Sequence, residues 1–211
     1  MFSENLLQWY KVYKRDLPWR QESDPYKIWI SEVVLQQTRV EQGIKYYQRF
    51  TEKYPTVFEL AKADDDEILL MWQGLGYYNR ALNLLRGAKE IVTRFNGVFP
   101  KTAAELKTIR GIGDYTAAAI ASIAYNEPLA AIDGNLKRIF SRIGAVEISI
   151  NSKNFQNTIS GEIARVFNFS KAGECNQALM DLGAIVCTPR KPKCMDCPLL
   201  AGCFGKKLAI A

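Results

Sequence analysis

The sequence predicts an all-α protein, and three observations support this class. Apolar residues recur at helical spacing, as in Val40, Ile44, Tyr47 and Phe50. Helix start and stop signals are frequent, whereas strand-like alternation is confined to the short stretch Val146–Ile150. The chain has 211 residues and no low-complexity linker. We therefore expect two helical lobes packed along a shared groove.

The first helices are marked by prolines and caps. Asp24 precedes Pro25, which places a capping side chain before a proline at the first helical position. Pro55 separates the next two helices, because the residue before a proline disfavours helical geometry.

The middle helices follow the same logic. Leu82, Leu85 and Val92 predict one apolar face in a helix from about Tyr78 to Phe95, and Asn96-Gly97 ends it. Two further signals, the capping box from Thr102 to Glu105 and the separator Pro128, predict the next boundaries.

Composition limits the chemistry and the compartment. The formal net charge is +6, which is compatible with a polyanionic partner. The chain has no histidine, which excludes mixed Cys/His zinc sites and histidine bases. The apolar run Ala117–Ala124 is too short to span a bilayer, and the N-terminus lacks the pattern of a secretory signal. We expect an intracellular, reducing location.

Four cysteines near the C-terminus are the most informative feature. Cys187, Cys194, Cys197 and Cys203 have the spacing C-x6-C-x2-C-x5-C. Four thiolates in so short a stretch can meet at one point, and such a soft ligand set selects an iron–sulfur cluster or zinc. Cys175 lies outside this group, and we expect a buried free thiol there.

A glycine hairpin is the next feature. Gly111 and Gly113 follow a helix expected to end near Ile109. They precede Asp114 and a new helix that contains Ala117–Ala121. Two such glycines permit a tight reversal and bring backbone N–H groups close to an anion. The pattern predicts a helix-hairpin-helix that grips a phosphate, although the same glycines can serve packing alone.

Three other motifs accompany the hairpin. Glu32 lies between two apolar runs, so we expect partial desolvation and a raised pKa, as a general acid needs. Asp133 stands at the start of a helix, where it can also be an N-cap. Trp72–Arg80 contains a glycine-aromatic turn that can present a ring to a nucleobase.

Together these motifs resemble the helix-hairpin-helix DNA glycosylases, and among them the adenine DNA glycosylases of MutY type. The resemblance extends from Asp16 to Cys203. Its most specific pieces are the segments Ser31–Thr38, Gly74–Tyr78 and Asp133–Asn135, together with the cysteine spacing.

The resemblance implies the domain organisation and the cofactor. It implies a six-helix barrel at residues 25–131, with its helix-hairpin-helix at about 104–121, and a [4Fe–4S] cluster domain formed by residues 1–24 and 132–211. The two domains would flank a DNA-binding groove. The four cysteines would be the cluster ligands, with zinc as the alternative.

The resemblance also implies catalytic roles. Glu32 would protonate the leaving adenine of a flipped nucleotide, and Asp133 would stabilise the positively charged sugar. Tyr115 stands where bifunctional relatives carry a lysine, so we expect base removal without strand cleavage. Asn135 would support the geometry around Asp133.

A further set of residues would contact DNA. Gln37 and Tyr77 would wedge into the base stack, and Arg20 and Trp29 are candidates for the adenine pocket. Backbone N–H groups of the hairpin and cations of the cluster loop would bind phosphate. These are Gly111, Gly113, Arg190, Lys191 and Lys193.

The implied partner is double-stranded DNA with adenine opposite 8-oxoguanine or guanine. We expect the protein to act as a monomer at the nucleoid, in the cytoplasm of a bacterium, without membrane contact. The chain stops shortly after Cys203, so we expect no C-terminal 8-oxoguanine-recognition domain. Two alternatives remain. One is a thymine or uracil mismatch glycosylase of the same superfamily, and the other is a non-catalytic helix-hairpin-helix DNA-binding protein with an iron–sulfur cluster.

Overall fold

The computed structural model describes residues 2–147, 149, 152 and 154–207. Every regular element in this part is a helix, which confirms the predicted all-α class. The strand candidate Val146–Ile150 falls partly outside the described residues, and residues 146, 147 and 149 form no strand. Among the described helices, none combines the length and the apolar character needed to cross a bilayer.

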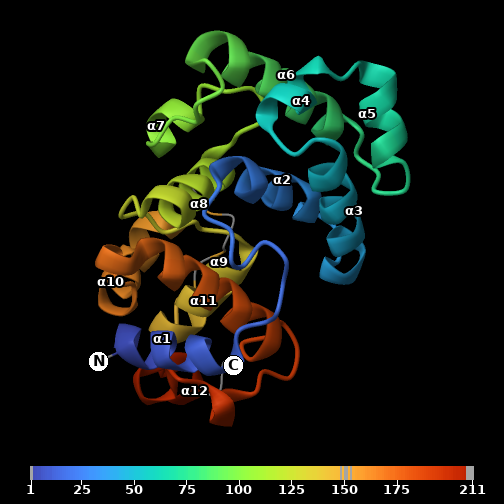
Figure 1. Cartoon of the computed structure of the whole chain (residues 1–211). Coiled ribbons are helices and arrows are strands. Elements are labelled where there is room, and N and C mark those ends of the chain that lie inside the picture. Colours follow the sequence, from blue (N-terminus) through green and yellow to red (C-terminus); the bar gives the residue numbers. More distant parts are fainter. Residues whose placement is uncertain (1, 148, 150–151, 153, 208–211) are drawn as a thin grey trace. The chain divides into compact units, whose positions relative to one another are not determined.

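The chain divides into two compact units. We call residues 16–127 the middle unit, and residues 1–15 with 128–211 the terminal unit. The middle unit holds seven helices, labelled in Figure 1: α2 (Pro25–Leu35), α3 (Val40–Lys53), α4 (Val57–Lys62), α5 (Asp65–Trp72), α6 (Asn79–Phe95), α7 (Ala103–Leu106) and α8 (Asp114–Tyr125).

Helix α2 is the centre of the middle unit. It packs against α3, α6 and α8, and it is apolar on nearly every side. A helix that is apolar all round belongs in a core. Its start is fixed as predicted, because Asp24 Oδ1 accepts the N–H of Tyr26 at 2.9 Å and Pro25 occupies the first turn.

The apolar face of α6 differs from the prediction. Leu85 is buried, but Leu82 and Val92 are only half-buried. The face that packs on α4 and α5 carries small residues beside the leucines, and these were not counted in the predicted stripe. It consists of Ala81, Leu84, Leu85, Ala88 and Ile91. The predicted end is confirmed, since Asn96 adopts φ 52°.

The first helix of the hairpin ends at Leu106, three residues before the predicted Ile109. The N–H groups of Thr108 and Ile109 bond to carbonyls three residues back, so the chain continues in tight turns rather than in α-helix. The capping box at its start is present, with the Glu105 N–H donating to Thr102 Oγ1 at 3.3 Å.

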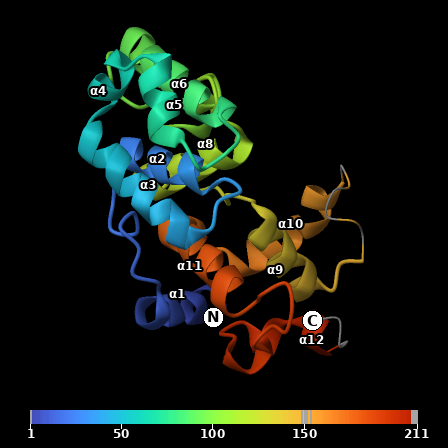
Figure 2. The same ribbon diagram turned by 90° about the vertical axis from the view of Figure 1, so that its right-hand side faces the viewer.

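The terminal unit is built around α11 (Ala172–Ile185), which packs against α1 (Phe2–Tyr13) and α9 (Gly134–Gly144), as Figure 2 shows. Two further helices, α10 (Phe155–Val166) and α12 (Phe204–Lys207), pack against α9. Short 3₁₀ turns at Phe169–Lys171, Cys194–Asp196 and Leu200–Gly202 complete the unit.

A buried ion pair ties the chain after α1 to α11. The Asp181 carboxylate is fully buried, and Arg15 donates to its Oδ1 from Nε at 3.1 Å and from Nη2 at 2.8 Å. The Arg15 backbone N–H donates to Oδ2 at 3.0 Å. A buried carboxylate is costly unless it is paired in this way.

We predict that Arg15→Ala lowers the free energy of unfolding by about 2 kcal/mol, because two hydrogen bonds to a buried charge are lost. For a chain of this size, the midpoint of thermal unfolding should fall by roughly 4–8 °C. Lys11→Ala, on the exposed face of α1, is the matched control and should leave the midpoint unchanged. An equal midpoint for both variants would contradict the prediction.

Candidate active site and iron–sulfur centre

Helix α2 carries the predicted acid. Glu32 is buried, with 6% of its surface exposed. One turn earlier, Trp29 is fully buried, and its indole meets the ring of Phe99 edge-on at 5.7 Å between ring centres. Arg20 lies half-buried before the helix. The structure therefore desolvates Glu32, and it places Trp29 in the core of the middle unit.

The two predicted wedge residues share an unusual backbone. Gln37 has φ 55° and Tyr77 has φ 48°, a region that residues other than glycine rarely adopt. Both are exposed. The guanidinium of Arg80 contacts the carbonyls beside both of them. Burial lowers the pKa of Arg80, and the charge of Tyr77 acts in the opposite direction.

The hairpin glycines differ in what the fold requires of them. Gly111 has φ 82°, and a Cβ there would lie 2.9 Å from the Cβ of Asn83 on α6. Gly113 has φ −88°, and a Cβ there would meet nothing within 4 Å. The fold thus needs glycine at 111, whereas at 113 the absence of a side chain keeps the start of α8 open.

The first turn of α8 has no side-chain cap, so its N–H groups are not bonded to a capping side chain. Asp114 begins this turn and pairs with Lys107. Tyr115 follows and is half-buried.

Asp133 caps α9 in the terminal unit. Its Oδ1 accepts the N–H of Leu136 at 2.8 Å, and its Oδ2 accepts from Asn135 Nδ2 at 2.8 Å. The carboxylate is thereby fixed at the positive end of a helix dipole. Glu32 belongs to the middle unit, and the convergence of the two carboxylates stays a prediction.

Arg138 extends this set of hydrogen bonds to the cysteines. It donates to Asn135 Oδ1 at 2.9 Å, to the carbonyl of Gly183 at 2.9 Å, and from Nε to the carbonyl of Cys187 at 2.9 Å. A continuous chain of hydrogen bonds therefore runs from Asp133 through Asn135 and Arg138 to the backbone of Cys187.

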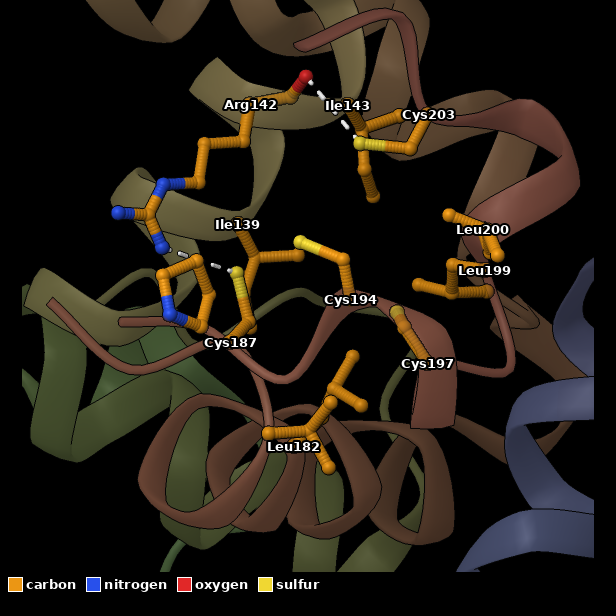
Figure 3. A pocket seen from close by; sticks show the side chains of 12 residues that line it. Ile139, Arg142, Ile143, Leu182, Cys187, Cys194, Cys197, Leu199, Leu200 and Cys203 are labelled. Atoms are coloured by element: carbon orange, nitrogen blue, oxygen red, sulfur yellow. Dashed lines mark hydrogen bonds between the residues drawn. The ribbon is translucent and has the colours of Figure 1, made fainter. Parts of the chain in front are cut away.

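The four cysteines line one cavity, part of which is open to solvent (Figure 3). Apolar side chains of α9 and α11 form much of the remaining lining, including Ile139, Ile143 and Leu182. Sequence analysis predicted that these cysteines meet, and the structure brings all four to this cavity. Cys175 is fully buried elsewhere, as predicted.

Arg142 holds the loop that follows the first cysteine. Its Nη1 lies 3.5 Å from Sγ of Cys187 (Figure 3). The same Nη1 donates to the Thr188 carbonyl at 2.7 Å. Its Nη2 donates to the carbonyl of Pro189 at 3.1 Å. The predicted cations of this loop are all exposed, namely Arg190, Lys191 and Lys193.

The donor set is chemically suited to an iron–sulfur cluster. Four thiolates are soft ligands, and such a set selects iron–sulfur clusters or zinc. Burial raises the pKa of the Cys197 thiol to about 11, so metal binding there must displace a proton.

Comparison with known proteins identifies the family. The model of the HhH-GPD superfamily of base excision DNA repair proteins matches residues 30–164, which is more than half of the chain. The chain belongs to this superfamily. The iron-sulfur binding domain of endonuclease III matches residues 187–203, the stretch from the first to the last of the four cysteines. This match confirms the prediction of a [4Fe–4S] cofactor.

The curated relatives that match this chain include several adenine DNA glycosylases. Adenine DNA glycosylase of Homo sapiens is 40% identical over 98% of this chain and 39% of its own length. Adenine DNA glycosylase of Buchnera aphidicola subsp. Baizongia pistaciae is 40% identical over 96% of this chain and 58% of its own length. The chain thus spans less than two thirds of these relatives.

Solved structures confirm the fold. A thermostable thymine-DNA glycosylase superposes with a TM-score of 0.85 at 29% identity, covering 98% of this chain and 95% of that one. Endonuclease III in a non-covalent DNA complex superposes with a TM-score of 0.77 over 97% of this chain and 94% of that one. At 22% identity, the second likeness concerns the fold alone.

Sequence reasoning missed three arginines that hold these sites together: Arg80, Arg138 and Arg142. Each lies on a helix and bonds mainly to backbone carbonyls far away in the sequence. Every residue has a backbone carbonyl, so the sequence does not show which carbonyl accepts such a hydrogen bond. The only available signal was spacing, since Arg138 lies one turn after Asn135 on the same face of α9.

We predict that Cys194→Ala lowers the iron content per chain and the broad visible absorbance of the purified protein, because one of the cavity thiols is lost. Cys175→Ala removes a buried thiol outside the cavity and is the matched control. Iron analysis and visible spectra of both variants provide the measurement. Equal iron loss in the control would mean that general destabilisation, rather than ligation, governs cluster retention.

Proposed function

We propose that this chain hydrolyses the N-glycosidic bond of adenine mispaired with 8-oxoguanine or guanine in double-stranded DNA. The observation that carries the proposal is the 40% identity to adenine DNA glycosylases of animals, a plant and bacteria over nearly the whole chain. Adenine is proposed as the excised base because the relatives are named adenine DNA glycosylases. The mechanism is proposed from the residues of this chain.

Adenine inside a duplex is stacked, so the nucleotide has to be flipped out before the bond can break. Cleavage leaves electrons on the purine and positive charge on the sugar. Glu32 is our proposed general acid, because its burial favours the protonated form that can donate to the adenine ring. The same carboxylate can afterwards help to activate water.

Asp133 is the proposed anionic partner of the sugar. Two donors fix both of its oxygens, which lie at the start of α9. A preorganised anion stabilises developing positive charge without reorganisation during the reaction. Asn135 supports this geometry. Tyr115 cannot form the Schiff base that a lysine would form, so we propose base removal without strand cleavage.

DNA binding is proposed for three groups of residues. The uncapped start of α8, with Gly111 and Gly113, suits a phosphate. Gln37 and Tyr77 are exposed and suit insertion into the base stack. Arg190, Lys191 and Lys193 suit contact with the DNA backbone. Arg20 and Trp29 remain proposals for the adenine pocket, although the core position of Trp29 requires a rearrangement before its ring can touch a base.

The four cavity cysteines would hold the [4Fe–4S] cluster. Bound there, the cluster supplies covalent crosslinks between the end of α11 and the C-terminal turns. The chain's own residues then fix the basic loop, with Arg142 bonded to its backbone. We also propose that the protein acts as a monomer at the bacterial nucleoid.

One observation favours a second candidate, a thymine mismatch glycosylase. The thymine-DNA glycosylase structure superposes on this chain with a TM-score of 0.85. Its identity is lower, at 29%. We therefore rank it second.

Single-turnover assays on a panel of duplexes test the proposal. Adenine, thymine or uracil is placed opposite guanine or 8-oxoguanine, and the free base is measured. We predict release of adenine, and a loss of at least about 10³-fold in Glu32→Gln with mismatch binding retained, since the acid is absent. Glu41→Gln, exposed on α3, is the matched control and should keep the wild-type rate.

The outcomes separate the candidates. Release of thymine in place of adenine would support the second candidate. Binding with no free base from any duplex would support a non-catalytic DNA-binding protein. Undiminished turnover in Glu32→Gln would remove Glu32 from the acid role.

We predict that Asp133→Asn slows adenine release by about 10²-fold or more, because the anion is lost while the cap is kept. Asparagine can still accept the Leu136 N–H. Asp64→Asn makes the same change at the N-cap of α5, where Oδ1 accepts the Glu67 N–H at 2.8 Å. It should leave the rate unchanged. An unaltered single-turnover rate in Asp133→Asn would exclude the charge from the mechanism.

A further inference from the structure

We infer that Arg80 is a positioning residue that holds Gln37 and Tyr77 in the backbone conformation with which they enter DNA. The inference rests on the proposed function, because it assigns a cause to the geometry of the two proposed wedge residues. All the residues that carry it lie in the middle unit.

The first step is the strain at the two wedge positions. Gln37 follows the end of α2, and Tyr77 ends the turn between α5 and α6. Both have positive φ. For a residue with a Cβ, this conformation is unfavourable, because the Cβ comes too close to a backbone carbonyl oxygen. Such strain persists only where the surrounding structure determines it, and it gathers at functional sites.

The second step is the set of acceptors around one guanidinium. Arg80 lies in the first turn of α6, and its two terminal nitrogens donate hydrogen bonds to two different segments of the chain. Nη1 donates to the end of α2, and Nη2 donates to the turn that carries Tyr77. The acceptors are the carbonyls of Val33 (3.0 Å), Val34 (3.4 Å) and Gln36 for Nη1, and those of Leu75 (3.2 Å) and Gly76 (3.3 Å) for Nη2.

The third step is the position of these carbonyls. Gln36 and Gly76 directly precede Gln37 and Tyr77 in the chain. A hydrogen bond to the carbonyl before a residue fixes the peptide plane on which its φ depends. The last carbonyls of a helix also have no partner within the helix, and they favour a cation. One side chain therefore sets both unusual turns.

The fourth step concerns the rings. The Arg80 guanidinium lies 5.0 Å from the ring centre of Trp72 and 5.8 Å from that of Tyr77. Trp72 is fully buried, and its Nε1 donates to the Gly76 carbonyl at 2.9 Å. The Tyr77 ring is 67% exposed. Contact with a cation anchored to the core thus orients a ring that is otherwise largely free of the protein.

Lysine cannot replace this arrangement. A guanidinium is planar and presents donors in two fixed directions, whereas an ammonium is a compact point charge on a flexible stem. Arg80→Lys keeps the charge and the apolar stem, but the ammonium cannot donate hydrogen bonds to the end of α2 and to the Tyr77 turn at the same time. We expect both turns to loosen, and the proposed insertion into DNA to become less effective.

Hydrogen exchange of the free protein tests the positioning role without DNA. In Arg80→Lys, amides of residues 36–39 and 74–78 should exchange at least about tenfold faster than in the wild type, which corresponds to about 1.4 kcal/mol of lost local stability. Arg86→Lys, exposed on the same helix, is the matched control and should show no change. Unchanged exchange in Arg80→Lys overturns the inference.

Single-turnover release from two duplexes tests the link to DNA. One duplex holds the target adenine opposite 8-oxoguanine, and the other holds it as an unpaired single-base bulge, which is easier to extrude. A loss of wedge positioning should slow Arg80→Lys about tenfold on the paired adenine and clearly less on the bulged one. Equal losses on both overturn the inference, because they indicate general damage.

Two further results keep the outcomes distinct. A wild-type protein that releases no adenine overturns the proposed function itself, whereas an active wild type with an unaffected Arg80→Lys overturns only the inference. If thermal unfolding shows that Arg80→Lys does not fold, Trp72→Phe is the second variant, because it removes the hydrogen bond from the Trp72 indole to the Gly76 carbonyl. It should then give the same pattern to a smaller extent, and its absence overturns the inference.

Discussion

The hydrogen bonds of Arg138 are the constraint on which the terminal unit depends. One guanidinium joins the side chain of Asn135, the end of α11 and the backbone of Cys187. Asn135 in turn holds Asp133. The candidate catalytic carboxylate and the first cluster cysteine are therefore parts of one rigid arrangement. Three hydrogen bonds therefore connect the cysteine loop to the cap of α9.

The features that follow local rules could be predicted from the sequence. Asp24 with Pro25, the capping box at Thr102, and Asn96 at the end of α6 all act through neighbours within four residues, and the structure has each of them. The four cysteines belong to the same class, because their short spacing leaves little choice about where the thiols meet. Burial of Glu32 between two apolar runs also followed from local pattern.

The features that the sequence did not predict depend on partners far along the chain. The buried face of α6 is set by α4 and α5, which select small residues such as Ala81 and Ala88 that a search for large apolar residues overlooks. The roles of Arg80 and Arg138 depend in large part on carbonyls 44 or more residues away. The positive φ of Gln37 and Tyr77 was also not predicted, because glutamine and tyrosine do not favour that conformation.

Substrate choice has to be argued from the site, because one fold serves several bases. The thymine-DNA glycosylase likeness is a likeness of scaffold, at a TM-score of 0.85 but 29% identity. Adenine is a poor leaving group until its ring is protonated, so the proposed acid at Glu32 agrees with the proposed adenine substrate. The central position of α2 gives Glu32 its burial, and the end of the same helix carries the turn that Arg80 holds. Helix α2 thus bears the proposed proton donor, and the turn directly after it bears one proposed wedge, so the same packing fixes the positions of both residues.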